Sequence, residues 1–210
     1  MRRTLALSLL AAAMLVTLQA HAADRTLAVA PFTAVDNAGP ISVRIEVGKA
    51  QSVTASGSEL FLEALQVEVV GDELRLKMRD KTSSRGLGDP KIVITVPQLT
   101  AFTMGGAGET AITHMSGDSL DIRFGGAGSL RAEGSVRTLK LNVGGVGSID
   151  TRQLHAANVD VHVGGIGSVK VWASDRLDGT VGGIGSLTYY GDPAIVNTNS
   201  GGIGSISRGK

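Results

Sequence analysis

Residues 139–148 have the sequence LKLNVGGVGS, and residues 159–168 have the sequence VDVHVGGIGS. The end of each stretch belongs to a motif, Gly-Gly-x-Gly-Ser/Glu, with six copies, which start at Gly105, Gly125, Gly144, Gly164, Gly182 and Gly201. Successive copies lie 20, 19, 20, 18 and 19 residues apart. Repetition at such a period is typical of solenoid proteins, in which each repeat forms one coil stacked on the last.

The residues before each Gly-Gly pair alternate between apolar and polar side chains, as in 139–143 and 159–163. This alternation predicts half-buried β-strands. We expect the chain to turn at Gly-Gly and again at Gly-Ser, because the apolar residues that follow fall out of phase there and glycine suits a sharp corner. The prediction is an all-β fold, a parallel β-helix or β-solenoid with about 19–20 residues per coil in the C-terminal half.

Stacked coils place equivalent residues in columns. We expect the third motif residue to stack inside the solenoid in every coil: Ala107, Ala127, Val146, Ile166, Ile184 and Ile203. We expect a second column of serines: Ser129, Ser148, Ser168, Ser186 and Ser205, with Glu109 in the first coil. On the outer face Asp121, Lys140 and Asp160 alternate in sign, so neighbouring coils should attract each other there.

The first residues have the features of an export signal. Arg2 and Arg3 precede an apolar run over residues 5–18, and Ala20-His21-Ala22 forms a cleavage site of small residues. We therefore expect a signal peptide at 1–22 and a mature chain, 23–210, that is exported to the periplasm or secreted, with no transmembrane segment after cleavage. The chain has no cysteine, so we expect neither disulfides nor a lipoprotein anchor.

The mature chain is expected to be one β-solenoid domain. Residues 100–210 would form the six motif-bearing coils, and residues 23–99, which lack the motif, would form wider coils that cover one end. Residues 67–78 have the pattern of a hairpin that turns at Gly71-Asp72. Cleavage lowers the formal net charge of the chain from +1 to about −1, so no nucleic-acid partner is expected.

Several fragments of the mature chain resemble the head GIN domain family, which is labelled a putative auto-transporter adhesin. They are 32–35 (FTAV), 39–43 (GPISV), 67–74 (VEVVGDEL) and 94–99 (ITVPQL), followed by the glycine repeats. The resemblance implies a right-handed parallel β-helix-like fold in an exported bacterial protein. It implies no catalytic motif.

The motif is not expected to hold a metal or a cofactor. Calcium-binding β-rolls carry an aspartate at the sixth position of a similar motif. Here that position holds apolar side chains that cannot coordinate Ca²⁺: Leu130, Ile149, Val169, Leu187 and Ile206. No catalytic residue is assigned.

We predict an exported, non-enzymatic module of the bacterial cell envelope with an adhesin-like binding or structural role, and a glycan or an envelope protein as its partner. The candidate binding face is the variable polar row before the motif: Arg123, Asn142, His162, Thr180 and Asn199. A candidate aromatic patch consists of Trp172, Tyr189 and Tyr190.

Two alternatives stay open at this point. Polysaccharide-active enzymes also use β-helices and need grouped carboxylates, and Asp121, Asp160 and Asp178 share an outward face with Arg123. An uncovered last coil could instead pair with a second chain through the solenoid ends and build a homo-oligomer.

Overall fold

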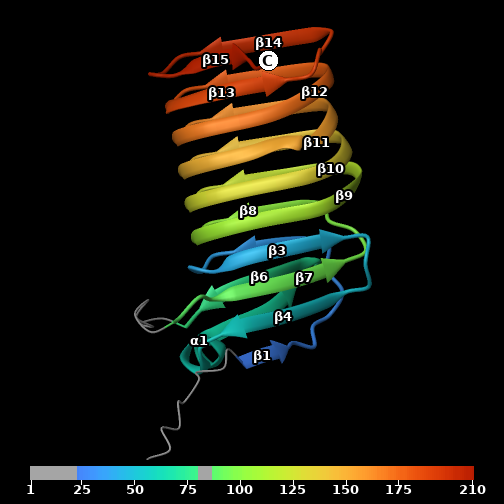
Figure 1. The fold of residues 1–210 in the computed structure, drawn as a ribbon, viewed down its shortest axis with the longest axis vertical. Coiled ribbons are helices and arrows are strands. Elements are labelled where there is room, and N and C mark those ends of the chain that lie inside the picture. Colours follow the sequence, from blue (N-terminus) through green and yellow to red (C-terminus); the bar gives the residue numbers. More distant parts are fainter. Residues whose placement is uncertain (1–22, 80–86) are drawn as a thin grey trace, which may run out of the picture.

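The computed structural model describes residues 23–79 and 87–210, so the predicted signal peptide lies outside the described residues. The repeats form a tall stack of parallel coils (Figure 1). Their strands are β9 (Ala107–Phe124), β10 (Ala127–Val143), β11 (Val146–Val163), β12 (Ile166–Val181), β13 (Ile184–Tyr190), β14 (Ile195–Ser200) and β15 (Ser205–Arg208). The predicted parallel β-solenoid is confirmed.

The motif residues stack in register, but the third motif residue points outward. Val146, Ile166 and Ile184 are 54%, 50% and 54% exposed, and Ile203 is 80% exposed. The expectation that this column stacks inside is therefore wrong. The alternation continues through the motif without a break, because the glycines at the second and fourth motif positions take the inward positions, as Gly145 and Gly147 do between Val143 and Ile149.

Glycine is required at the second motif position because the coils approach closely there. A Cβ on Gly145 would lie 2.0 Å from the carbonyl oxygen of Gly126 in the preceding coil. The same overlap recurs at Gly126, whose Cβ would lie 1.8 Å from the carbonyl oxygen of Gly106. At the Gly-Gly turn, the backbone of each coil therefore packs directly on the backbone of the coil before it.

The second predicted corner is misplaced. β10 continues through Gly128 and Ser129 without interruption, and the irregularity in its pairing with β9 lies between Ala132 and Gly134. Gly134 has φ 130°, and a Cβ there would lie 2.1 Å from the carbonyl oxygen of Met115. The coil therefore bends at a bulge in the middle of each long strand.

Two of the predicted columns can be followed through the stack. The serines pair in register, and Ser148 Oγ lies 3.2 Å from Ser168 Oγ. Asp121, Lys140 and Asp160 are also in register. In the described part of the chain, however, Lys140 and Asp160 make no ion pair, and Asp121 pairs along its own strand with Arg123, at 2.7 Å.

The interior of the stack is aliphatic. Buried side chains of successive coils lie above one another, as Leu130, Ile149, Val169 and Leu187 do. One continuous apolar cluster runs from Phe32 in the N-terminal part to Leu187 near the last coil. This single core holds the outer faces rigid.

The N-terminal part mixes coil-like and antiparallel pairing. β2 (Ala34–Asn37) pairs in parallel with β8 (Ala101–Met104), and β3 (Ser42–Val47) pairs in parallel with both β7 (Lys91–Val96) and β9. β1 (Ala23–Thr26) and β4 (Ser52–Gly57) are antiparallel to their neighbours. Wider coils alone therefore do not describe this part of the chain.

The hairpin and a short helix complete the N-terminal part. β5 (Leu65–Val70) and β6 (Glu73–Met78) form the predicted antiparallel hairpin, with Gly71 at φ 67° in the turn. α1 (Glu59–Ala64) begins at Ser58, whose side chain accepts a hydrogen bond from the Phe61 N–H. Phe61 is fully buried, and α1 lies at the end of the stack opposite to β14 and β15 (Figure 1).

Candidate functional site

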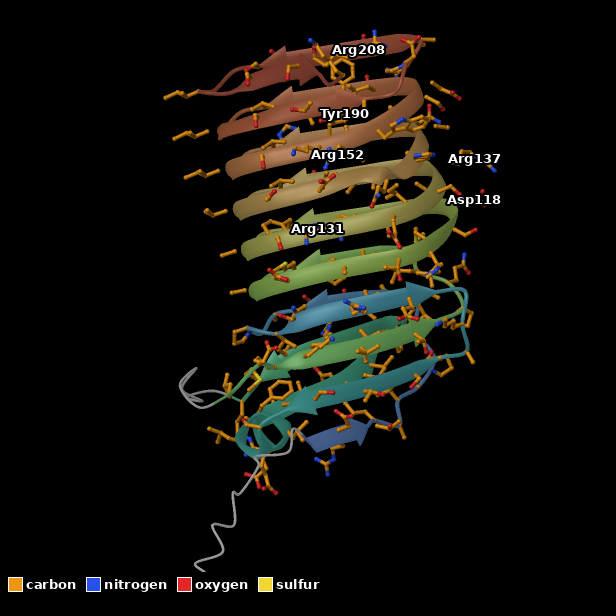
Figure 2. All side chains as sticks on the ribbon, in the orientation of Figure 1. Asp118, Arg131, Arg137, Arg152, Tyr190 and Arg208 are labelled. Atoms are coloured by element: carbon orange, nitrogen blue, oxygen red, sulfur yellow. The ribbon has the colours of Figure 1, made fainter. Side chains whose placement is uncertain are left out.

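An open pocket of about 990 Å³ lies on one face of the stack. It is lined by charged and aromatic side chains and by the last residues of the chain: Arg131, Asp150, Arg152, Gln153, Trp172, Tyr190, Gly191, Arg208, Gly209 and Lys210. We call this pocket the aromatic groove. Figure 2 shows Arg131, Arg152, Tyr190 and Arg208, from β10, β11, β13 and β15, on the same face of the stack.

The strand register builds the aromatic groove. Arg131, Asp150 and Lys170 are paired neighbours in β10, β11 and β12, two residues after the serine of each motif. Trp172 and Tyr190 are paired neighbours in β12 and β13. Because outward positions alternate along a strand, a charged column and an aromatic column lie side by side on this face.

A bidentate ion pair fixes the floor of the groove. Arg152 donates from Nε to Asp150 Oδ1 at 2.9 Å and from Nη2 to Oδ2 at 2.6 Å. These hydrogen bonds lower the pKa of Asp150 and raise the pKa of Arg152. Asp150 is therefore a fixed anion at neutral pH and a poor proton donor.

The aromatic side chains are held by their neighbours. The rings of Trp172 and His155 stack with centroids 4.4 Å apart and an interplanar angle of 25°. The guanidinium carbon of Arg152 lies 5.5 Å from the centre of the Tyr190 ring, within cation–π range. Trp172 and Tyr190 are both half-buried, so each retains ring surface that a ligand can cover.

Only part of the predicted aromatic patch comes together. Trp172 and Tyr190 line the groove, but Tyr189 is not among the residues that line it and packs against the apolar core. Tyr189 pairs with the buried Val171, so its side chain starts from the inward position of the strand. The alternation of side chains separates these two adjacent tyrosines.

The predicted polar row exists as a row, away from the aromatic groove. Its members pair in register through the second halves of the long strands and β14: Arg123, Asn142, His162, Thr180 and Asn199. Within this row only Arg123 makes an ion pair that the described residues include, with Asp121. Along each long strand, the row lies C-terminal to the bulge, whereas the groove lies N-terminal to it.

Sequence reasoning missed Arg131, Asp150, Arg152 and Arg208. A signal for the first two was present, since both stand two residues after the motif serine, as Lys170 does. Aligning the coils on the serine would have placed all three in one column. Arg208 had no such signal, because it reaches the groove from the last strand, where it pairs with Asp192 at 2.9 Å.

Within residues 23–79 and 87–210, no three His, Cys, Asp or Glu side chains lie close enough together to hold a metal ion. The helical part of this region offers no segment with the length and apolar character needed to cross a bilayer.

Comparison with known proteins agrees with this architecture. The crystal structure of a putative adhesin from Bacteroides fragilis is 25% identical, covers 90% of this chain and 98% of its own, and superposes with a TM-score of 0.74. A putative adhesin from Parabacteroides distasonis, 17% identical over 90% of this chain and 97% of its own, has the same fold at a TM-score of 0.50. No curated protein is similar enough to match the chain.

A family model covers most of the chain. The model described as "Putative auto-transporter adhesin, head GIN domain" matches residues 31–193, which include the hairpin, the mid-strand bulges and five of the six glycine motifs. This match confirms the resemblance drawn from the sequence fragments. The chain therefore belongs to the head GIN domain family.

Proposed function

We propose that this protein is an exported, non-enzymatic binding module of the cell envelope, and that the aromatic groove is its glycan-binding site. Membership of an adhesin family supports a cell-surface or exported protein with an adhesin-like role. The observation that carries the proposal is the pairing of Trp172 and Tyr190 beside Arg131 and Arg152 in one open pocket.

This combination suits a sugar. The flat rings of Trp172 and Tyr190 offer apolar faces on which the C–H face of a pyranose can stack. The Asp150 carboxylate accepts hydrogen bonds from hydroxyl groups, and the arginines donate them. Because these side chains sit on a rigid sheet, little conformational entropy is lost when a ligand binds.

The enzyme alternative is less well supported by the carboxylates present. A glycosidase needs a carboxylic acid that retains a proton near neutral pH. Hydrogen bonds from Arg152 lower the pKa of Asp150, and those from Arg176 and Asn197 lower the pKa of Asp178. Both groups are therefore held ionised, which suits recognition better than proton transfer.

The test compares two surfaces of one protein on immobilised glycans. We expect Trp172→Ala to lower affinity about tenfold, because a lost contact of ~1.4 kcal/mol corresponds to that factor. Trp172→Phe should retain part of the affinity, since a ring remains. Arg123→Ala, on the polar row, is the control and should bind as the wild type does.

Two results would contradict the proposal. One is loss of binding in Arg123→Ala while Trp172→Ala binds normally, which would move the site to the polar row. The other is turnover of a glycan substrate that disappears in Asp150→Asn or Asp178→Asn. Circular dichroism spectra of all variants establish that each one is folded.

A further inference from the structure

A second pocket continues the aromatic groove toward the N-terminal part. It measures about 260 Å³ and is lined by polar and charged side chains from four neighbouring strands and the segment before β7: Ser42, Val43, Arg44, Asp89, Lys91, Glu109, Thr110, Ala111, Ser129 and Arg131. Arg131 lines both pockets. The two hollows therefore adjoin at one side chain, and we call them together the path.

This path runs across the strands, along the axis of the stack. The sheet order is β7-β3-β9-β10-β11-β12-β13-β15, so Lys91 in β7 and Arg208 in β15 stand at its two ends. Seven steps between neighbouring strands at ~4.8 Å each give a path of roughly 33 Å. A monosaccharide would occupy only a small part of it.

The path is more cationic than anionic. The described residues that line it include six cationic side chains, Arg44, Lys91, Arg131, Arg152, Arg208 and Lys210, against three carboxylates, Asp89, Glu109 and Asp150. Among the described residues Arg44, Lys91, Arg131 and Lys210 have no ion-pair partner within 4.0 Å, whereas Arg152 and Arg208 are paired. Four cations are thus free to meet an external anion.

We propose that the glycan ligand is an anionic polysaccharide that lies along this path, with Arg131 at its centre. This inference rests on the proposed function and specifies its ligand. Arg131 is exposed and shared by both pockets, so it can pair with a ligand carboxylate while sugar rings cover Trp172 and Tyr190. Paired charge and stacked ring together suit a ligand that carries both an anion and a sugar ring.

A nucleic acid fits the path less well. Asp89, Glu109 and Asp150 stand between the cations, and each would repel a continuous phosphate backbone. A polysaccharide offers hydroxyl groups to these carboxylates as well as anions to the cations. The mixed charge pattern therefore favours an acidic glycan over a nucleic acid.

The experiment measures binding of polygalacturonate and of the same polymer with its carboxylates methyl-esterified, by calorimetry with the mature chain. The wild type should bind the acidic polymer at least tenfold more tightly than the esterified one. Arg131→Gln should lower affinity for the acidic polymer about tenfold and affinity for the esterified polymer by a smaller factor, because the glutamine amide still donates hydrogen bonds and only the charge pairing is lost. Arg137→Gln is the matched control, since Arg137 is exposed and pairs with Asp118 at 2.8 Å at the edge of the stack, away from the path (Figure 2).

Ligand length supplies a second measurement. If the ligand lies along the path, a hexagalacturonate should bind at least tenfold more tightly than a digalacturonate, because it reaches further strands on both sides of Arg131. Equal affinity for the two lengths would place the ligand in one pocket and overturn the inference.

The outcomes separate the inference from the proposed function. Equal binding of acidic and esterified polymers, with loss in Trp172→Ala, overturns the anionic ligand and keeps a glycan-binding groove. Binding of single-stranded DNA that falls in Arg131→Gln and exceeds that of every acidic polymer tested overturns the glycan class. Absence of binding to polygalacturonate, alginate and hyaluronan alike overturns both.

Discussion

The Gly-Gly turn and the aromatic groove belong to the same coils, but their residue types vary differently from coil to coil. In the turn, each coil repeats the same residue types, and the structure shows why: a Cβ at the second glycine would overlap the carbonyl of the coil before it. In the column that supplies Arg131 and Asp150 to the groove, equivalent positions differ from coil to coil, from Ala111 through Arg131 and Asp150 to Lys170.

This difference separates architecture from recognition within one chain. A solenoid must satisfy the same backbone geometry at every step, so the residues that set the geometry recur. A ligand that lies across several coils presents a different group to each, so the residues that contact it need not recur. Substitutions in the turn should therefore affect folding, and substitutions in the groove should affect binding.

The largest expected effect comes from Gly145→Ala. The added Cβ would lie 2.0 Å from the Gly126 carbonyl oxygen, and backbone on both sides cannot yield without separating two coils. We expect a loss of stability of about 3–5 kcal/mol, at the upper end for single substitutions. Thermal unfolding followed by circular dichroism measures it.

The matched control is the preceding residue of the same motif. A Cβ on Gly144 would meet no atom within 4 Å, so Gly144→Ala should change stability by less than about 1 kcal/mol. If the two variants unfold at the same temperature, the close approach of the coils does not explain the second glycine.

The next effect compares one residue type on the inside and on the outside of the stack. Ile149 is fully buried, so Ile149→Ala should cost about 2–5 kcal/mol. Ile166, in the third motif position, is 50% exposed, so Ile166→Ala should cost below about 1 kcal/mol. Denaturant unfolding of the two variants measures both losses of stability. Equal losses would mean that the third motif residue points into the core.

The fold could be predicted from the sequence because its signals are local and repeated. The alternating strand and the motif are visible in residues 139–148, and their recurrence in residues 159–168 shows the period. The orientation of the third motif residue could not be predicted, because Val146 is apolar and its exposure depends on Gly145 occupying the inward position. The sequence does not show whether an apolar side chain between two glycines points into the core or toward solvent.

The site was less predictable than the fold. Trp172 and Tyr190 were identified as rare aromatic residues, but their partners come from other coils, and Arg208 comes from a strand whose place depends on the whole stack. The bulges also shift the register, so that His155 pairs with Trp172 although Asp150 pairs with Lys170. Offsets counted from the motif fail beyond such a bulge.

The smallest expected change in stability, and the one that most sharpens the comparison, comes from Asp150→Asn. The Asp150–Arg152 pair is partly exposed, so its loss should cost about 0.2–1 kcal/mol at neutral pH. The same change frees Arg152 for a ligand anion. We therefore expect affinity for polygalacturonate to rise several-fold while stability falls slightly, and affinity for the esterified polymer, which loses a hydrogen-bond acceptor and gains no charge pairing, not to rise.

The pH dependence of this variant follows from the lowered pKa of Asp150. Because its native-state pKa lies below the ordinary 3.8, the ion pair contributes stability above about pH 4 and loses that contribution as the pH falls through the native-state pKa. Melting temperatures of wild type and Asp150→Asn should thus differ by a constant amount from pH 5 to pH 8 and converge in stronger acid. A difference that widens with acidification would show that Asp150 is not the ionised partner of Arg152, and the groove would then lack the fixed anion that distinguishes it from a uniformly basic surface.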